Sequence, residues 1–140
     1  MTSCYLDASA IVKLATLEAE TEALRAHVRQ HQHLITSRLA TVEVPRALLR
    51  RGPASVDAGA VGIQAAFEHL QLVELDEAIA RTAADLMPDT LRSLDAIHLA
   101  SALAIGDELA EFITYGARLA TAARAAGLEV GSPGLTMLRE

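Results

Sequence analysis

The chain alternates short apolar runs with longer segments in which apolar residues recur every three or four positions. The short runs predict buried strands at 4–6, 34–36, 72–75, 112–115 and 128–130. The longer segments predict helices over 8–17, 18–31, 39–51, 61–71, 77–86, 94–105 and 117–126. Short apolar strands that alternate with helices are typical of a parallel sheet covered on both faces. We therefore predict an α/β protein with three α/β/α layers and a short-stranded, mainly parallel central sheet.

Several residues mark where the predicted helices begin and end. Gly52-Pro53 ends the helix at 39–51, Asp76 is a suitable N-cap for the helix at 77–86, and Gly106 ends the helix at 94–105. A connection of small residues is expected after Pro53. No linker, repeat or low-complexity segment interrupts the 140 residues, so we predict a single domain over 1–140.

Composition and charge exclude some classes of protein. A hydrophobic fraction of 51% argues against disorder, and a net charge of −6 argues against a protein that coats nucleic acid nonspecifically. That charge does not exclude an enzyme that grips nucleic acid locally. Of the 12 basic residues only Lys13 is a lysine and the others are arginines. The planar guanidinium group of arginine binds a phosphate with two parallel hydrogen bonds better than a lysine ammonium does.

Cysteine content and hydropathy indicate the compartment. The single Cys4 excludes an internal disulfide and a Cys-based zinc cage. The first apolar run is broken by Asp7, unlike a signal peptide, and no run approaches the roughly 18 uncharged residues of a membrane helix. We expect a cytoplasmic protein with no membrane partner.

Three acidic residues have apolar neighbours: Asp7 in Tyr5-Leu6-Asp7-Ala8, Glu43 in Val42-Glu43-Val44, and Asp95 in Leu94-Asp95-Ala96. A carboxylate among core-type residues is costly to bury unless its charge is compensated. Three carboxylates that converge would suit a hard cation such as Mg²⁺ or Mn²⁺. A structural interpretation stays open, in which Asp7 and Asp95 are helix N-caps and Glu43 pairs with Arg46.

These segments resemble a known family. The stretch Tyr5 to Leu14, the stretch Thr36 to Leu48, the stretch Leu91 to Ala100 and the stretch Phe112 to Leu128 resemble, in order, the motifs of a PIN domain. The resemblance covers nearly the whole length and is most specific to VapC-type ribonuclease toxins of bacterial toxin–antitoxin pairs. The third stretch, Leu91-Arg92-Ser93-Leu94-Asp95-Ala96-Ile97-His98-Leu99-Ala100, is the most specific match.

The resemblance implies a site and a reaction. Asp7, Glu43 and Asp95 would bind Mg²⁺ or Mn²⁺ and be catalytic, and a metal-activated water would cut RNA. Ser9 and Thr114 resemble the hydroxyl residues near the family's site. Arg46 and Arg92 are candidates for phosphate contact, with an ion pair to a nearby acid as the alternative. A fourth acid usually follows the strand at 112–115, but this chain has Gly116 there.

Histidines form the remaining pattern of interest. His27 and His31 lie four apart on a predicted helix, with His33 beyond, a spacing that can hold zinc. The segment is otherwise polar and no Cys or acid completes the set in sequence, which favours a solvated face. His98 follows Asp95 by three residues, and a structural role beside the site is favoured over a general base.

Three hypotheses for function follow. The leading one is a metal-dependent endoribonuclease toxin, by resemblance a homodimer neutralised by a cognate VapB-like antitoxin. The second is a catalytically impaired PIN domain, with Gly116 in place of the fourth acid, that binds RNA or protein. The third is an interaction module whose acids are caps and salt bridges.

Overall fold

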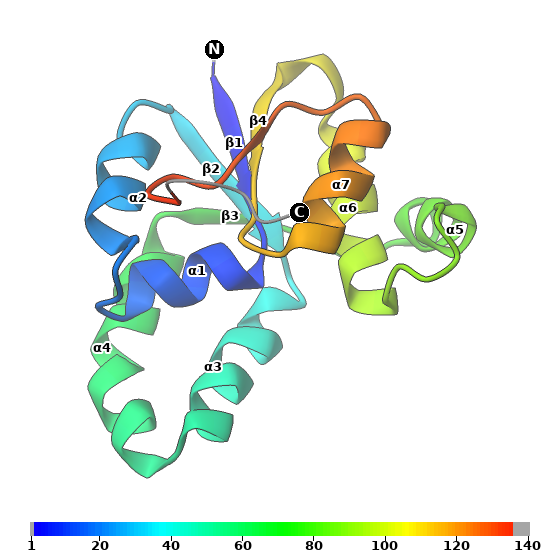
Figure 1. The fold of residues 1–140 in the computed structure, drawn as a ribbon. Helices are drawn as coiled ribbons and strands as arrows, with labels where there is room; N and C mark the ends of the chain where they lie inside the picture. Colours follow the sequence, from blue (N-terminus) through cyan, green and yellow to red (C-terminus); the bar gives the residue numbers. More distant parts are fainter. Residues whose placement is uncertain (1, 136–140) are drawn as a thin grey trace.

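A five-stranded parallel sheet forms the centre of the protein. The computed structural model describes residues 2–135, and the strands lie in the order β3-β2-β1-β4-β5 (Figure 1). Their bounds are β1 Ser3–Leu6, β2 His33–Ser37, β3 Leu70–Val73, β4 Leu109–Ile113 and β5 Val130–Gly131. All four strand pairings are parallel, which confirms the predicted α/β class.

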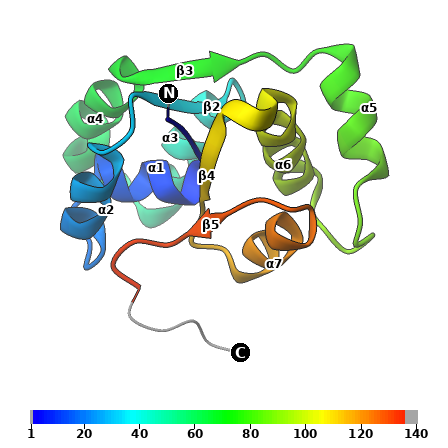
Figure 2. The same ribbon diagram turned by 90° about the horizontal axis from the view of Figure 1, so that it is seen from above.

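Helices cover both faces of the sheet. Figure 2 shows one layer to the left of the sheet, made of α1 Ala8–Ala15, α2 Thr21–Val28, α3 Ala40–Arg51 and α4 Pro53–Glu68. The other layer contains α6 Ser93–Ile105 and α7 Ala117–Ala125, with α5 Glu77–Asp85 packed against α6. A 3₁₀ turn, η1, spans Gly106–Glu108. The three-layer arrangement is therefore confirmed.

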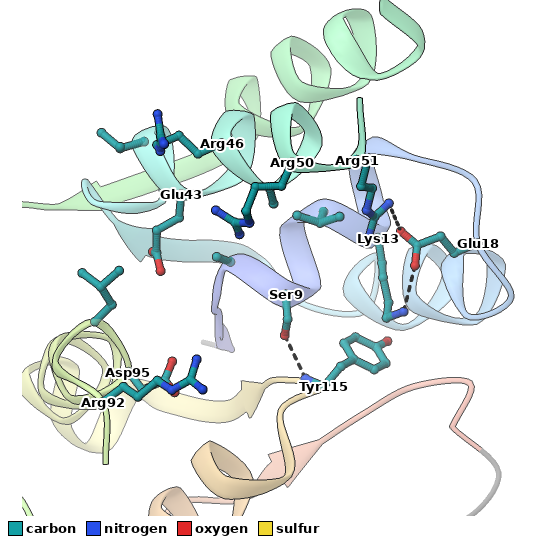
Figure 3. Close-up of a pocket in the computed structure, with 15 residues that line it drawn as sticks. Ser9, Lys13, Glu18, Glu43, Arg46, Arg50, Arg51, Arg92, Asp95 and Tyr115 are labelled. Atoms are coloured by element: carbon teal, nitrogen blue, oxygen red, sulfur yellow. Dashed lines mark hydrogen bonds and ion pairs between the residues drawn. The ribbon is translucent and has the colours of Figure 1, made fainter. Parts of the chain in front are cut away.

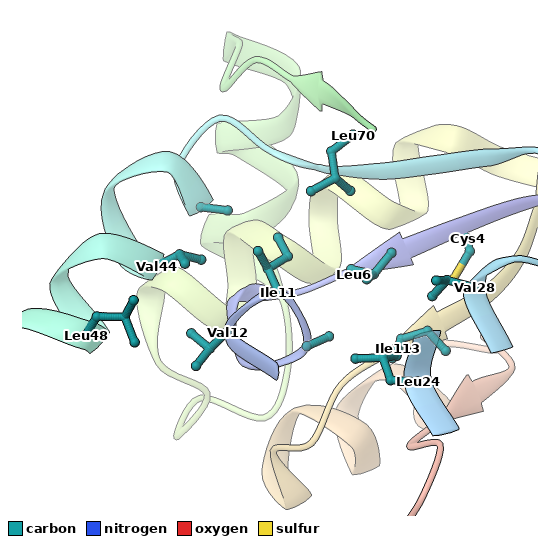
Figure 4. Packing of buried hydrophobic residues seen from close by; sticks show 12 residues of the cluster. Cys4, Leu6, Ile11, Val12, Leu24, Val28, Val44, Leu48, Leu70 and Ile113 are labelled. Atoms are coloured by element: carbon teal, nitrogen blue, oxygen red, sulfur yellow. The ribbon is translucent and has the colours of Figure 1, made fainter. Parts of the chain in front are cut away.

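Strand β1 lies between two hydrophobic clusters. Its alternation sends Cys4 and Leu6 to the side of α1–α4 and Tyr5 to the side of α6 and α7. Figure 4 shows the first cluster, where Leu6 packs near Ile11 and Cys4 lies beside Val28. Because β1 is fully buried on both faces, the position of the residue that follows it is rigidly fixed.

Helix starts and stops agree with the sequence at several points. Asp76 caps α5 by accepting a hydrogen bond from the backbone N–H of Ile79 at 2.8 Å. Gly106 ends α6 with a positive φ of 76°, a conformation that favours glycine. Within residues 2–135 no helix combines the length and hydropathy needed to cross a bilayer.

Helix α4 is where the sequence prediction of a loop was wrong. The small residues after Pro53 belong to the helix, and Pro53 itself is its first residue. The small side chains serve close packing instead of a turn. A Cβ on Gly59 would collide with the Leu48 side chain, and one on Gly62 would collide with the carbonyl of Ala15. Glycine is needed there because α4 packs directly on α1 and α3.

Two strands also lie earlier than predicted. β3 ends at Val73 instead of Leu75, and β4 ends at Ile113 instead of Tyr115. The local apolar pattern does not mark the ends of a strand, whereas pairing with the neighbouring strand sets the true limits. As a consequence Thr114 follows the end of β4, level with the residue that follows β1.

Candidate active site

Asp7 stands at the carboxyl end of β1, the edge of a parallel sheet where ligands gather. Its Oδ1 accepts hydrogen bonds from Ser9 Oγ at 2.7 Å and from the Ala10 backbone N–H at 3.0 Å. Its Oδ2 accepts one from Thr114 Oγ1 at 2.5 Å. Asp7 is thus the N-cap of α1, as the structural interpretation expected, and also lies at the candidate site. Ser9 and Thr114, which the resemblance places near the site, both contact Asp7.

The Asp7 carboxyl group is buried, and burial raises its pKa despite the opposing effects of His98, Thr114, Ser9 and Ala10. An ionised carboxylate has about four acceptor positions on its two oxygens. Three are taken by the hydrogen bonds above, so one remains for a cation. A cation would also compensate the buried charge.

Glu43 is held by a chain of buried hydrogen bonds from the sheet. His98 Nε2 lies 2.6 Å from Glu43 Oε1, and His98 Nδ1 lies 2.7 Å from the Tyr5 hydroxyl. Burial lowers the pKa of His98, but the hydrogen bond and charge of Glu43, with the charges of Asp7 and Asp95, outweigh it and raise the pKa. Glu43 therefore pairs with His98, and the predicted alternative pairing with Arg46 is wrong: no such ion pair occurs among residues 2–135.

Asp95 belongs to the first turn of α6, whose N-cap is Arg92, so the N-cap interpretation of Asp95 is wrong. Its pKa is raised first by burial, then by the charges of Asp7 and Glu43, with His98 and Arg92 opposing. Asp7 and Glu43 therefore repel the charge of Asp95, although the three residues come from distant parts of the chain. A cation among them would relieve that repulsion.

These residues surround a cavity of about 610 Å³, which we name the acidic pocket. Glu43 and Asp95 line opposite walls, and Figure 3 shows both carboxylates turned toward the space between them. Asp7 lies behind the wall, bonded to Ser9, which lines the pocket. Five of the chain's 12 basic residues also line it: Lys13, Arg46, Arg50, Arg51 and Arg92. A chain of net charge −6 thus gathers its cations around one acidic cavity.

The arginines differ in how far they are already paired. Arg46 and Arg92 are exposed and make no ion pair within the described residues, so the ion-pair alternative for them is not supported. Lys13 bonds Glu18 at 3.1 Å and Glu20 at 2.9 Å, and Arg51 bonds Glu18 at 3.2 Å. The sequence analysis missed Lys13, Arg50 and Arg51. Their spacing along α1 and α3 was a signal, since Arg46 and Arg50 are one turn apart.

Gly116 is the N-cap of α7, close to the hydroxyl that supports Asp7. Its backbone N–H donates to Thr114 Oγ1 at 3.1 Å. A Cβ added at Gly116 would lie 3.6 Å from Thr114 Oγ1 and 4.0 Å from Leu119 Cβ, which are ordinary contacts. The backbone is extended with φ of −89°, so a larger residue fits without strain.

The donor set fits a hard divalent ion, because all three side chains offer oxygen. Among residues 2–135, however, Asp7, Glu43 and Asp95 are not a group whose ligand atoms all lie within 4.8 Å of one another. Mg²⁺ usually keeps several waters and takes one or two carboxylates directly. The spacing is therefore compatible with an ion that contacts part of the set through water.

The protein is thus a parallel α/β/α sandwich with an acidic pocket at the carboxyl ends of β1 and β4. The sequence pattern of the PIN domain matches residues 4–125. The chain therefore belongs to the PIN domain family.

Known proteins place it among the VapC-type members. It is 43% identical over 133 residues to Ribonuclease VapC46 of Mycobacterium tuberculosis, covering 95% of this chain and 99% of that protein. Its fold is similar to the crystal structure of M. tuberculosis VapC20, described as a sarcin-ricin loop cleaving toxin, with a TM-score of 0.69 at 14% identity over 89% of this chain and 95% of that one. It is also similar to VapBC2 of Rickettsia felis bound to a promoter DNA fragment, with a TM-score of 0.69 at 9% identity over 92% and 97% of the two chains.

Proposed function

We propose that this protein is a metal-dependent endoribonuclease toxin that acts in the cytoplasm and is neutralised by a VapB-like antitoxin. One observation carries the proposal: Glu43 and Asp95 face each other across one basic-rimmed pocket, and Asp7 is hydrogen-bonded to Ser9 in its wall. The name of the relative at 43% identity, a ribonuclease, supports the same chemistry.

Asp7, Glu43 and Asp95 are proposed to hold Mg²⁺ or Mn²⁺, which when bound supplies a water of lowered pKa for phosphodiester hydrolysis. The remaining residues position these ligands. Ser9 and Thr114 fix both oxygens of Asp7, and His98 fixes one oxygen of Glu43. Such supporting hydrogen bonds preorganise a metal site before the ion arrives.

The basic rim is proposed to bind the RNA backbone. Arg46 and Arg92 are exposed on opposite sides of the pocket, where a guanidinium can take a phosphate in bidentate fashion (Figure 3). Arg50, on the same face of α3 as Arg46, extends this surface. Two carboxylate walls would repel RNA without these cations, so the rim sets where the strand can approach.

The mouth of the pocket suits a protein partner as well. Val42 and Leu94 line it and are 58% and 46% exposed, which is unusual for large apolar side chains. An antitoxin segment with an arginine or lysine would meet both the apolar mouth and the acidic floor. Leu17 and Val61 are exposed away from the pocket and support a proposed homodimer, which light scattering on the purified protein would test.

A second candidate function rests on Gly116. A PIN domain that lacks the fourth acid would bind RNA or a protein partner without cutting. Gly116 offers no side chain, and Thr114, whose hydroxyl accepts the Gly116 backbone N–H, already donates to Asp7. The two candidates differ in a single measurable property, which is cleavage.

The test is to incubate the purified protein with structured RNA and Mg²⁺ or Mn²⁺. We expect cleavage that EDTA abolishes and that is lost in Asp7→Asn and in Glu43→Gln. The matched control is Glu108→Gln, an exposed acid of η1 outside the pocket, which should cut normally. RNA that stays intact at high protein concentration, while still binding, would support the impaired PIN domain instead.

A further inference from the structure

A second group of ligand-type side chains lies away from the acidic pocket. Cys4, His31 and Glu111 each bring one ligand atom within 4.8 Å of the other two. None of the three lines the acidic pocket. Cys4 precedes Asp7 by three residues along β1, which separates them by about 10 Å of extended chain. We name this group the Cys4 cluster.

Strand pairing explains why Cys4 and Glu111 meet. Cys4 of β1 is the register partner of Glu111 of β4, so both side chains leave the sheet on the same face. Leu6 and Ile113 occupy that face too, under α2 (Figure 4). Glu111 is therefore a carboxylate directed toward an apolar layer. Such a charge is costly to bury without compensation.

Two histidines from α2 and the turn after it contact this carboxylate in different ways. His27 Nε2 lies 2.5 Å from Glu111 Oε1 and forms a hydrogen bond. His31 Nε2 lies 3.3 Å from the same oxygen and forms none among the described hydrogen bonds. Two ligands about 2.0–2.1 Å from a tetrahedral ion lie about 3.3–3.4 Å apart. The His31–Glu111 spacing thus matches two ligands of one ion, whereas His27 orients the carboxylate from outside.

His31 is nearly buried, with Nε2 facing Glu111 and Nδ1 on the other edge of the ring. Its side chain is only 11% exposed, and its Nδ1 is the buried side-chain nitrogen or oxygen without a hydrogen-bond partner within residues 2–135. His31 also lines a cavity of about 580 Å³ between α2 and α4, which gives an ion a route to the ring.

The sheet leaves room for the carboxylate as well. A Cβ on Gly131 of β5 would overlap Glu111 Oε2 and would crowd Ile113. Glycine at this position leaves room for Glu111 Oε2 beside β5. The two oxygens of Glu111 therefore have different neighbours. Oε1 forms a hydrogen bond with His27, and Oε2 lies beside Gly131.

We propose that Cys4, His31 and Glu111 form a second metal site, for Zn²⁺, in which His27 positions Glu111. One sulfur, one nitrogen and one oxygen ligand suit Zn²⁺ and not Mg²⁺, which prefers oxygen alone. Three protein ligands leave the fourth tetrahedral position to water. The expectation that His27 and His31 form a solvated face is wrong, because both side chains lie against Glu111 and His31 is only 11% exposed. A single cysteine excludes a cage of several cysteines but not this mixed set.

Cobalt(II) is the probe for the test, because it binds at zinc sites and gives an absorption spectrum that zinc does not. The protein is first stripped with EDTA and then titrated with Co²⁺. Cys4 is the only cysteine of the chain, so a thiolate-to-cobalt charge-transfer band in the near ultraviolet must come from this site. We expect the band to saturate at one Co²⁺ per protein and to disappear on addition of Zn²⁺. If no band forms and no Zn²⁺ is retained after dialysis, the proposal is overturned.

Variants separate the cluster from a thiol that binds cobalt alone. His31→Asn and Glu111→Gln should weaken Co²⁺ binding most, and His27→Gln, at the exposed edge, should weaken it about 10- to 100-fold. Gly131→Ala should also weaken it, since it displaces the carboxylate while every ligand remains. His33→Asn is the matched control, a nearby histidine outside the cluster, and should bind as the wild type does. Wild-type affinity in both His27→Gln and Gly131→Ala would overturn the proposal even if the buried variants do not fold.

Discussion

The two groups of titratable side chains differ in where they lie on the same sheet. The acidic pocket opens at the carboxyl ends of β1 and β4, whereas the Cys4 cluster lies three residues earlier, beneath α2. In both groups burial is the main cause of raised pKa values. It raises the pKa of Asp7 and Asp95 at the acidic pocket and of the Cys4 thiol in the Cys4 cluster. The difference lies in access and in ligand type. An open edge with oxygen ligands and a basic rim suits a reaction, and a covered face with mixed ligands suits a stabilising ion.

The largest expected effect is the loss of RNA cleavage when a carboxylate of the acidic pocket is removed. Asp95→Asn removes one proposed ligand and should lower RNA cleavage at least about 100-fold, since a metal contributes several kcal/mol to such reactions. The cobalt band of Cys4 should not change in this variant, because Asp95 lies outside the Cys4 cluster. Asp107→Asn, an exposed acid of η1, is the control for both measurements. A cobalt band lost together with cleavage would show that the two groups are one site.

A smaller effect on Mn²⁺ dependence is expected when the hydrogen bond from His98 to Glu43 is removed. His98→Ala removes the contact of 2.6 Å and should raise the Mn²⁺ concentration for half-maximal cleavage about 10- to 100-fold, with much of the rate recovered at saturating Mn²⁺. Tyr5→Phe, which removes only the hydroxyl behind His98, should shift it less. A rate that stays low at saturating Mn²⁺ in His98→Ala would contradict a positioning role and indicate a direct one.

The vacant fourth acid position gives the next effect. Gly116→Asp adds a carboxylate where a Cβ has room, and should tighten Mn²⁺ binding about tenfold, which corresponds to about 1.4 kcal/mol. Gly116→Asn is the matched control, because asparagine caps α7 equally well but carries no charge. Isothermal titration with Mn²⁺ measures the difference. Equal affinities in the two variants would show that the fourth charge is not limiting here.

The smallest effect is a pH dependence of stability. Asp7 and Asp95 have raised pKa values, so the folded protein holds these protons more tightly than the unfolded chain does. Its free energy of unfolding therefore falls as pH rises through those pKa values. Mn²⁺ should restore it, raising the melting temperature more at about pH 8 than at about pH 5, by about 4 °C for each 1 kcal/mol.

Other groups should not mask this trend. Burial alone would raise the pKa of Glu18, but hydrogen bonds from Thr16, Lys13 and Arg51 lower it to about 2. The stability that Glu18 contributes is present above its unfolded pKa and is lost only as pH falls toward 2. Differential scanning fluorimetry of the wild type and Asp95→Asn would check the prediction, and an equal Mn²⁺ effect at both pH values would contradict it.

Local patterns in the sequence predicted much of the fold. The order of strands and helices, the cap at Asp76 and the stop at Gly106 all depend on a few neighbouring residues. The start of α4 was missed because Pro53 and Gly59 are read locally as loop residues, although Pro53 opens the helix and Gly59 lies against Leu48. The ends of β3 and β4 were misplaced because pairing with other strands sets them.

By itself the sequence determined which side chains are out of place, since Asp7, Glu43 and Asp95 have apolar neighbours that make an uncompensated charge costly. Only the tertiary structure decided what each of them meets. His98 forms a hydrogen bond with Glu43, which is 55 residues away in the sequence. Cys4 lies near Glu111 of the neighbouring strand and near His31, which follows α2. The reason is that a set of metal ligands is defined by the distances between its atoms in the folded protein. Residues that share no local pattern become neighbours only when the strands pair and the helices close over them.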